Sequence, residues 1–458
     1  MNAMNVSRVL RMGPALALCG TLAACATYAP QPLPGAVAWH DNAAGLRVTT
    51  RDIALPALAA QRIDLHAPLP IAAVAALAVL NDPRLRAVRD QAGVARAQAF
   101  AAGLLPAPTF AAERDIPQGQ SAATTTAYNL GLSFDLDQLI TRGAAVAAAR
   151  EHVREVDLGI LWQEWRTASV AELDYIALVG LRDRDRLLKT QRDAVLRRLG
   201  RDRAAALAGI APRTTADADL IELTTLRHKL ATDARRRAAK QGELDGMLGL
   251  APGQVLELAG LPRVEPTAVR DAAGAVNRLA RIRPDLMALR AGYASQEQTL
   301  RKAVLSQFPS LGITLSRARD TSNVHTLGFA IDFSLPIFNG SPGKIAVARA
   351  TRMQLYDTYR LRLQQAHTQV ARILVDLAIL GAEQSTLRAS LPALQSAARA
   401  ANRALRAGDI TLPQAQMQDQ AALDQRLFLQ ASEQHIAEQT VALQLLTGGG
   451  IFATASAH

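Results

Sequence analysis

The chain has 458 residues, a length that suits either two or three ordinary domains or one long helical object. Hydrophobic residues make up 49 % of it but aromatic residues only 4 %, and this composition predicts long helices packed closely side by side. The net charge of +11 comes from arginines that are mixed with acids along helical stretches. Because no basic run is interleaved with aromatics, nucleic-acid binding is disfavoured.

The N-terminus has the pattern of a bacterial secretion signal. Two arginines precede an apolar stretch, 14–24, that is too short to span a membrane as a helix. The stretch ends in Leu-Ala-Ala-Cys, which resembles the lipobox of bacterial lipoproteins. That resemblance implies removal of residues 1–24 and acylation of Cys25, and Ala26 in place of an aspartate favours the outer membrane. The alternative is an ordinary signal peptide with a chance cysteine.

Beyond the signal, the chain repeats one unit twice. The segment 81–110 matches 281–311, with Pro83 opposite Pro284, and the motif around Gly131 matches the one around Gly328. Order and spacing persist through both halves, so we interpret the chain as two copies of one supersecondary unit.

Each copy is predicted to run helix, strand, strand, long helix, turn, helix. The predicted segments, in chain order, are a signal peptide at 1–24, a lipidated N-terminal extension at 25–70, a first repeat at 71–250, a linker at 251–274, a second repeat at 275–449 and a tail at 450–458. The first repeat is expected to hold a helix at 71–104, strands at 109–115 and 128–137, and a helical hairpin at 144–248. The second is expected to hold a helix at 275–306, strands at 311–319 and 325–335, and a hairpin at 344–446.

The first arm of each hairpin, 144–207 or 344–406, is unusually long. At 1.5 Å per residue such a helix spans roughly 96 Å, about as much as two of the shorter helices placed end to end. Apolar residues recur at three- and four-residue spacing, which favours antiparallel coiled-coil packing. Pro392 falls inside the second arm and is expected to bend or break it.

The predicted strands alternate large apolar residues with small or polar ones. In 327–335, for example, Phe329 and Ile331 alternate with Ala330 and Asp332. Strands of about ten residues with apolar-out, polar-in alternation are typical of outer-membrane barrels, in which Asp135 and Asp332 would face the water-filled lumen. Four strands are too few to close a barrel, and lipid tolerates no open edge, so copies of the chain must share one. Two copies give 8 strands and three give 12.

With these features the chain resembles the TolC-like outer membrane efflux proteins over about 65–450. The resemblance rests on the duplicated unit, the Leu-Pro-Ala-Pro and Phe-Pro-Ser segments before the strands, and the Ala-Gly turns. It implies a mainly α homotrimer with a shared 12-stranded barrel and a helical tunnel through the periplasm. It also implies docking to a periplasmic adaptor protein and an inner-membrane transporter, with passive export of small molecules such as drugs or metals. No cofactor is implied apart from lipid on Cys25.

The resemblance also carries functional positions. The hairpin tips that contact adaptors match Gly209 and Ile210 in the first repeat, and Gly408, Asp409 and Thr411 in the second. The residues just after the tips match the closing gate of the tunnel. In the best-known member two aspartates sit six and nine residues beyond the second tip glycine, where this chain has Gln414 and Met417.

The sequence therefore does not predict a carboxylate ring at these two positions of the gate. Four nearby acids are candidates to replace it, and a solvated helix position is the default interpretation of each: Asp217, Asp219, Asp409 and Asp419.

Enzymatic motifs are absent from the sequence. It contains no H-E-x-x-H, G-x-S-x-G or P-loop pattern, and its 8 histidines do not pair at metal-ligand spacing. The only cysteine besides Cys25 is Cys19, which the signal removes, so no disulfide or thiolate metal site is expected. Two other functions remain open: the exit duct of a type I protein secretion system, and a non-conducting periplasmic coiled-coil scaffold lipoprotein.

Overall fold

The structure is a computed structural model that describes residues 28–118, 124–210, 212–262, 264, 269–271, 274–334 and 342–448. The signal peptide, Cys25 and the tail 450–458 lie outside these residues. The chain divides into two units, 1–39 and 40–458. The described part of the first, 28–39, is exposed and has neither helix nor strand. All elements below belong to the second unit.

The first helix of each repeat is divided at the repeated proline. Residues 71–104 form α3 (Ile71–Asn81) and α4 (Pro83–Gly103), and residues 275–306 form η3 (Val276–Arg278), α8 (Leu279–Ile282) and α9 (Pro284–Leu305). The prediction of one continuous helix in each place was therefore wrong. A proline disfavours the helical conformation of the residue before it, and Asp82 and Arg283 accordingly have ψ angles of 116° and 119°. Asp82 also caps α4 by accepting a hydrogen bond from the Arg84 amide.

The long hairpins are present in both repeats. They comprise α5 (Asp137–Leu207) with α6 (Arg213–Leu248), and α10 (Pro342–Ala407) with α11 (Leu412–Thr447). The 71 residues of α5 extend over roughly 106 Å. Both returning helices end at a glycine in the left-handed region, Gly249 with φ 68° and Gly448 with φ 71°, which a residue with a side chain rarely adopts.

Helix α10 continues without interruption through Pro392. The prediction of a break at this proline was therefore wrong. Side chains bond the turn that precedes the proline. The Gln425 amide of α11 donates to the Leu387 carbonyl at 3.0 Å and to the Ser390 hydroxyl at 2.6 Å, and Ser390 in turn donates to the Thr386 carbonyl. Packing against α11 thus helps the second arm keep its helical path.

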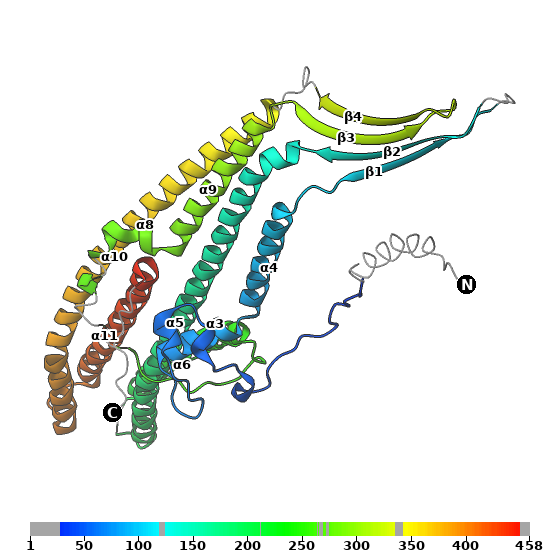
Figure 1. The fold of residues 1–458 in the computed structure, drawn as a ribbon. Helices are drawn as coiled ribbons and strands as arrows, with labels where there is room; N and C mark the ends of the chain where they lie inside the picture. Colours follow the sequence, from blue (N-terminus) through cyan, green and yellow to red (C-terminus); the bar gives the residue numbers. More distant parts are fainter. Residues whose placement is uncertain are drawn as a thin grey trace. The chain divides into compact units, whose positions relative to one another are not determined.

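Helix α5 is the element around which the others pack. It contacts α3, α4, α6, α9 and α11, while α10 contacts α9 and α11 (Figure 1). A buried cluster between the hairpins joins Leu188 and Val195 of α5 to Leu223 of α6 and Leu423 of α11. The predicted duplicated, mainly α architecture with antiparallel helix packing is confirmed.

Residues 40–70 pack against α3, the middle of α5 and the end of α6. They contain η1 (Ala43–Gly45), η2 (Thr50–Asp52) and α2 (Pro56–Ala59). Two isolated parallel bridges, His40 with Leu250 and Leu69 with Leu258, tie this segment to the chain that follows α6. The largest apolar cluster lies here, built from α3, the middle of α5 and the end of α6.

The strands are β1 (Thr109–Asp115), β2 (Ala127–Asp135), β3 (Ser310–Arg319) and β4 (His325–Ser334). They form one antiparallel sheet in the order β1-β2-β3-β4. The central β2–β3 pair therefore joins the two repeats, and β1 and β4 are the edges. Of the helices in the described residues, none is long and apolar enough to cross a membrane.

Candidate functional site

The two faces of the sheet differ in chemistry. Paired residues share a face, so the register aligns Phe110, Leu132, Leu315 and Phe329 in one row across all four strands. The adjacent row on the opposite face is Ala111, Gly131, Ser316 and Gly328. The apolar row is open to solvent in the single chain, since Phe110 is 65 % and Phe329 62 % exposed. One face is therefore suited to lipid and the other to water.

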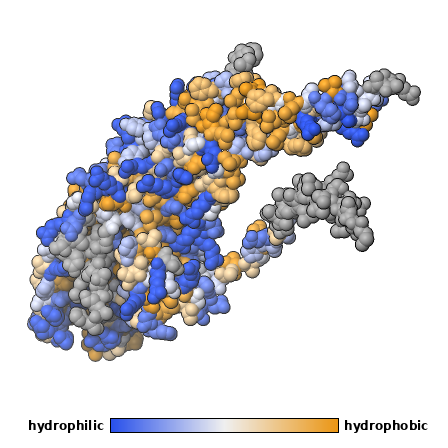
Figure 2. All heavy atoms as spheres, in the orientation of Figure 1, coloured by the Kyte–Doolittle hydropathy of each residue, from blue (hydrophilic) through white to orange (hydrophobic). Residues whose placement is uncertain are grey.

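The apolar face ends in a band of polar and aromatic residues, at the end of the sheet far from the helices. The Arg319 guanidinium lies 5.2 Å from the centre of the Tyr128 ring, and the Tyr128 hydroxyl lies 3.5 Å from His325 Nδ1. Figure 2 shows hydrophobic side chains gathered over the sheet near the helices and hydrophilic ones at its far end. Aromatic and cationic side chains of this kind are typical of a membrane–water interface.

The two predicted lumen carboxylates lie together. Asp135 and Asp332 both pair with Gly312, one from each neighbouring strand, on the face with small residues. Both are exposed. Asp332 accepts a hydrogen bond of 3.0 Å from the Thr314 hydroxyl, and Asp135 accepts one of 3.0 Å from the Asp137 amide at the start of α5. Two carboxylates thus stand where the sheet meets the helices.

The two hairpin tips have the same backbone geometry. At the first, the Ile210 amide donates to the Ala205 carbonyl and the Gly209 amide to Ala206. At the second, the Asp409 and Gly408 amides repeat this pattern with Ala404 and Leu405. This is the Schellman motif, and it requires the positive φ of Gly209 (71°) and Gly408 (84°).

The tips present exposed side chains. Ile210 is 80 % exposed, and Asp409 and Thr411 are also on the surface. Thr411 begins α11 in a capping box with Gln414, whose side-chain oxygen accepts from the Thr411 amide at 2.8 Å. The structure therefore gives Gln414 a role in capping. Met417, one turn further along, is 63 % exposed.

The candidate gate acids lie in different environments. Asp217 is exposed, but Asp219 is fully buried. Asp219 Oδ1 accepts from Arg198 Nε of α5 at 2.6 Å and from Gln416 Nε2 of α11 at 2.8 Å, so it links the two hairpins. Asp419 is half-buried and accepts from Asn402 at 2.6 Å. The default interpretation as a solvated position was therefore wrong for Asp219 and Asp419.

A second acid accompanies Asp219 in this link. Asp202 lies beside Asp219, and burial together with that neighbouring carboxylate raises the pKa of Asp202. Within the described residues, the Oδ2 atoms of both aspartates are buried without a hydrogen-bond partner. Arg198 also pairs with Glu222. This network was not predicted from the sequence, although Arg198 and Asp202 lie on one helix face at a spacing of four residues.

Comparison with solved structures gives the fold a context. The chain is similar to CusC, a structure described in terms of transmembrane channel formation, with 18 % identity and a TM-score of 0.67 over 86 % of this chain and 96 % of the other. It is similar to a membrane protein from Pseudomonas aeruginosa, with 18 % identity and a TM-score of 0.69 over 93 % and 100 % of the two chains. It is also similar to the CmeC outer membrane channel of Campylobacter jejuni, with 14 % identity and a TM-score of 0.68 over 93 % and 95 %.

Neither family models nor curated proteins gave a match to this chain. The structural similarity extends over most of this chain and nearly all of each solved chain. The chain therefore has the TolC-like fold of outer membrane channels.

Proposed function

We propose that the chain is the outer-membrane channel of an efflux system and acts as a homotrimer. The observation that carries this proposal is the four-stranded sheet with one apolar face and two unpaired edges, β1 and β4. A sheet in lipid must satisfy its edge amides and carbonyls, and joining β4 of one copy to β1 of the next does so. Three copies contribute 12 strands, enough for a closed barrel. CusC and CmeC support the assignment through their shared fold and their channel descriptions.

The water-filled path would follow the small-residue face of the sheet. Gly131, Ser316 and Gly328 leave room there, and Asp135 and Asp332 would place six carboxylates in a trimer near the junction with the helices. The path would continue between α5, α6, α10 and α11 in the periplasm. Its mechanism is passive conduction, for which the chain supplies walls and charges and catalyses no chemical step.

The hairpin tips are the proposed contact with a periplasmic adaptor and, through it, an inner-membrane transporter. Their shared Schellman geometry exposes Gly209, Ile210, Gly408, Asp409 and Thr411 at the ends of the coiled coils. Gln414, Met417 and Asp217 follow on the outer turns and are proposed to line the closed gate. The buried Asp219 would keep the gate shut by holding α6 to α11 through Gln416. Cys25 is the proposed lipid anchor.

Electrical recording tests the proposal. The purified protein, inserted into a planar lipid bilayer, is expected to give discrete conductance steps and to prefer cations, because the Asp135 and Asp332 rings attract them. The double variant Asp135→Asn/Asp332→Asn should conduct with a reduced cation preference, measured as the reversal potential in a salt gradient. An Asp41→Asn variant, exposed in the segment before the sheet and the hairpins, is the control and should keep the native selectivity.

A purified trimer that carries no current, even with Gln416→Ala to release the hairpin link, would exclude the conduit. Deletion of the gene then distinguishes efflux of small molecules from protein secretion. Increased sensitivity to drugs, dyes or metals supports efflux, whereas unchanged sensitivity with loss of a secreted protein supports secretion.

A further inference from the structure

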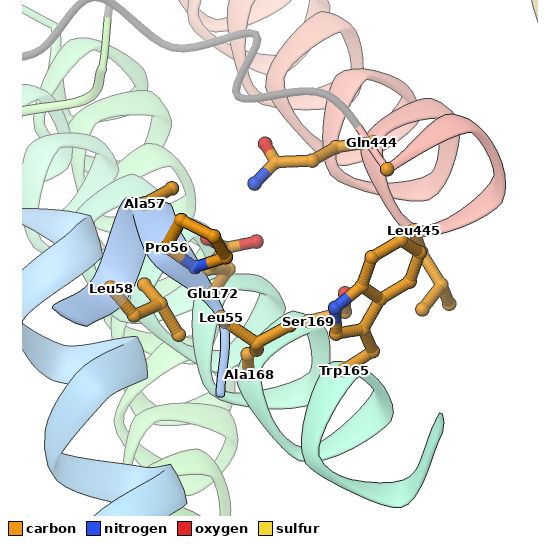
Figure 3. A pocket seen from close by; sticks show the side chains of 11 residues that line it. Leu55, Pro56, Ala57, Leu58, Trp165, Ala168, Ser169, Glu172, Gln444 and Leu445 are labelled. Carbon is orange, nitrogen blue, oxygen red and sulfur yellow. The ribbon is translucent and has the colours of Figure 1, made fainter. Parts of the chain in front are cut away.

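A pocket of about 250 Å³ lies where the N-terminal segment meets α5 and α11. Its walls are largely apolar: Leu55, Pro56 and Leu58 on one side, and Trp165, Ala168 and Leu445 on the other (Figure 3). The Trp165 ring packs against Gly448 at the end of α11, where an added Cβ atom would come within 2.5 Å of it. An apolar cavity of roughly 150 Å³ is enough to bind benzene, so this pocket suits a ligand somewhat larger than one aromatic ring.

Two polar groups line this apolar pocket without partners. Glu172 lines the pocket and is 3 % exposed. Among the described residues, none forms a hydrogen bond or an ion pair with its carboxyl group. Burial alone raises its pKa to about 8. The Gln444 side chain projects over the same space, with its amide nitrogen on the side of Glu172 (Figure 3). Its oxygen is buried and also lacks a donor, and a half-turn of the amide exchanges the two atoms. Such groups are normally satisfied, because an unpaired buried acceptor costs free energy.

The two unpaired side chains determine which class of ligand would suit the pocket. Both groups can accept hydrogen bonds, and one of them can carry a negative charge, so the complementary ligand is a donor with a positive charge. Burial favours the protonated form of Glu172 near neutral pH, so a ligand that completes this site has to stabilise the ionised form. A cationic donor does so, whereas an anion would be repelled by the ionised carboxylate and a metal ion would find only one carboxylate. The Trp165 ring adds a surface that favours a cation or an apolar group.

We propose that this pocket binds a small apolar amine, whose ammonium group donates hydrogen bonds to Glu172 and to the Gln444 side-chain oxygen. Its apolar body packs against Leu55, Leu58 and Trp165. The inference stands apart from the proposed conduit, because the pocket is built by residues of one chain and its occupancy can be measured without transport.

The test is calorimetric titration of the full-length protein in lipid nanodiscs, which keeps detergent out of the pocket. The probe is 2-phenylethylamine, and 2-phenylethanol is its neutral control of nearly the same size. A charge-assisted hydrogen bond should make the amine bind about tenfold or more tighter than the alcohol. Glu172→Gln should remove this preference, because it preserves shape but lacks the charge. The surface variant Glu383→Gln should leave it unchanged.

Equal binding of amine and alcohol to the native protein would overturn the proposal, as would a preference that survives Glu172→Gln. Should Glu172→Gln fail to assemble, Gln444→Leu gives a second reading, since it removes one acceptor and is expected to weaken the amine several-fold more than the alcohol. Equal weakening of both ligands by Gln444→Leu would also overturn the proposal. Loss of conductance in the bilayer, by contrast, would bear on the conduit and not on the pocket.

Discussion

At the scale of single residues, Glu172 makes stability depend on pH. Burial raises its pKa from an ordinary 4.5 to about 8, so the native state holds this proton more tightly than the unfolded chain does. Its contribution to stability is therefore full below pH 4.5 and is lost as pH rises towards 8, at up to about 1.4 kcal/mol per pH unit. Glu172→Gln cannot ionise, so it should gain thermal stability relative to the native protein as pH rises.

Melting temperatures followed by circular dichroism at pH 5 and pH 8 check this prediction. The advantage of Glu172→Gln over the native protein should be larger at pH 8, while Glu383→Gln should show no such change. A Glu172→Gln advantage that is the same at both pH values would show that this carboxyl group is not held neutral by burial.

Sequence reasoning could locate some of these residues and not others. Gly209 and Gly408 are visible because the repeat aligns them and a turn between long helices calls for a positive φ. Glu172 carries a local signal too, since Ala168, Ile176 and Val179 place it on an apolar stripe of α5. Asp219 has a similar signal, since Ala216, Leu223 and Leu226 place it on an apolar stripe of α6. Its partners have none, because Arg198 and Gln416 come from helices whose register only the assembled hairpins define.

At the scale of elements, three prolines that look alike have different outcomes. Pro83 and Pro284 begin helices, whereas Pro392 lies within α10. In the first two places the chain can turn, because the residue before the proline bonds the first turn of the helix that follows. Asp82 accepts from the Arg84 amide, and the Arg283 guanidinium donates to Asp285. At Pro392 continuous packing against α11 outweighs the local preference. Local rules predicted the existence and order of the elements, and tertiary packing decided where they are interrupted.

Replacing Pro392 should therefore stabilise the protein. Pro392→Ala restores an amide that can donate to the Arg388 carbonyl and removes the ring that crowds it, which is worth up to about 3 kcal/mol in a helix interior. A higher melting temperature is expected, measured by circular dichroism at 222 nm. Ser396→Ala, also exposed on α10, is the control and should change stability by no more than about 0.5 kcal/mol. A lower melting temperature for Pro392→Ala would mean that α11 is fitted to the proline.

At the scale of the whole molecule, the duplication allowed the fold to be predicted from the sequence. Strand alternation and long amphipathic helices recur twice, so an ambiguous segment such as β1 could be assigned from its clearer counterpart β3. The packing of residues 40–70 was not readable, because two isolated bridges and scattered apolar contacts leave no periodic trace. The association of subunits was inferred from a different argument, namely that four strands leave two edges unpaired.

Those edges provide the last prediction. If β1 of one subunit pairs with β4 of the next, a cysteine at Ala111 should form a disulfide with one of the positions Thr326, Gly328 or Ala330, which share the small-residue face. Opposite residues in antiparallel strands have Cβ atoms about 4.5–5.5 Å apart, so a slight adjustment is enough to form a disulfide.

Because Cys25 is proposed to carry lipid, the introduced thiols would be the only free ones. Oxidation should then yield covalent dimers and trimers on denaturing gels for one pairing, and pairing Ala111→Cys with Phe329→Cys, on the opposite face, should yield none. If none of the three same-face pairings links subunits, a shared barrel in which β1 and β4 meet in any of these three registers is excluded.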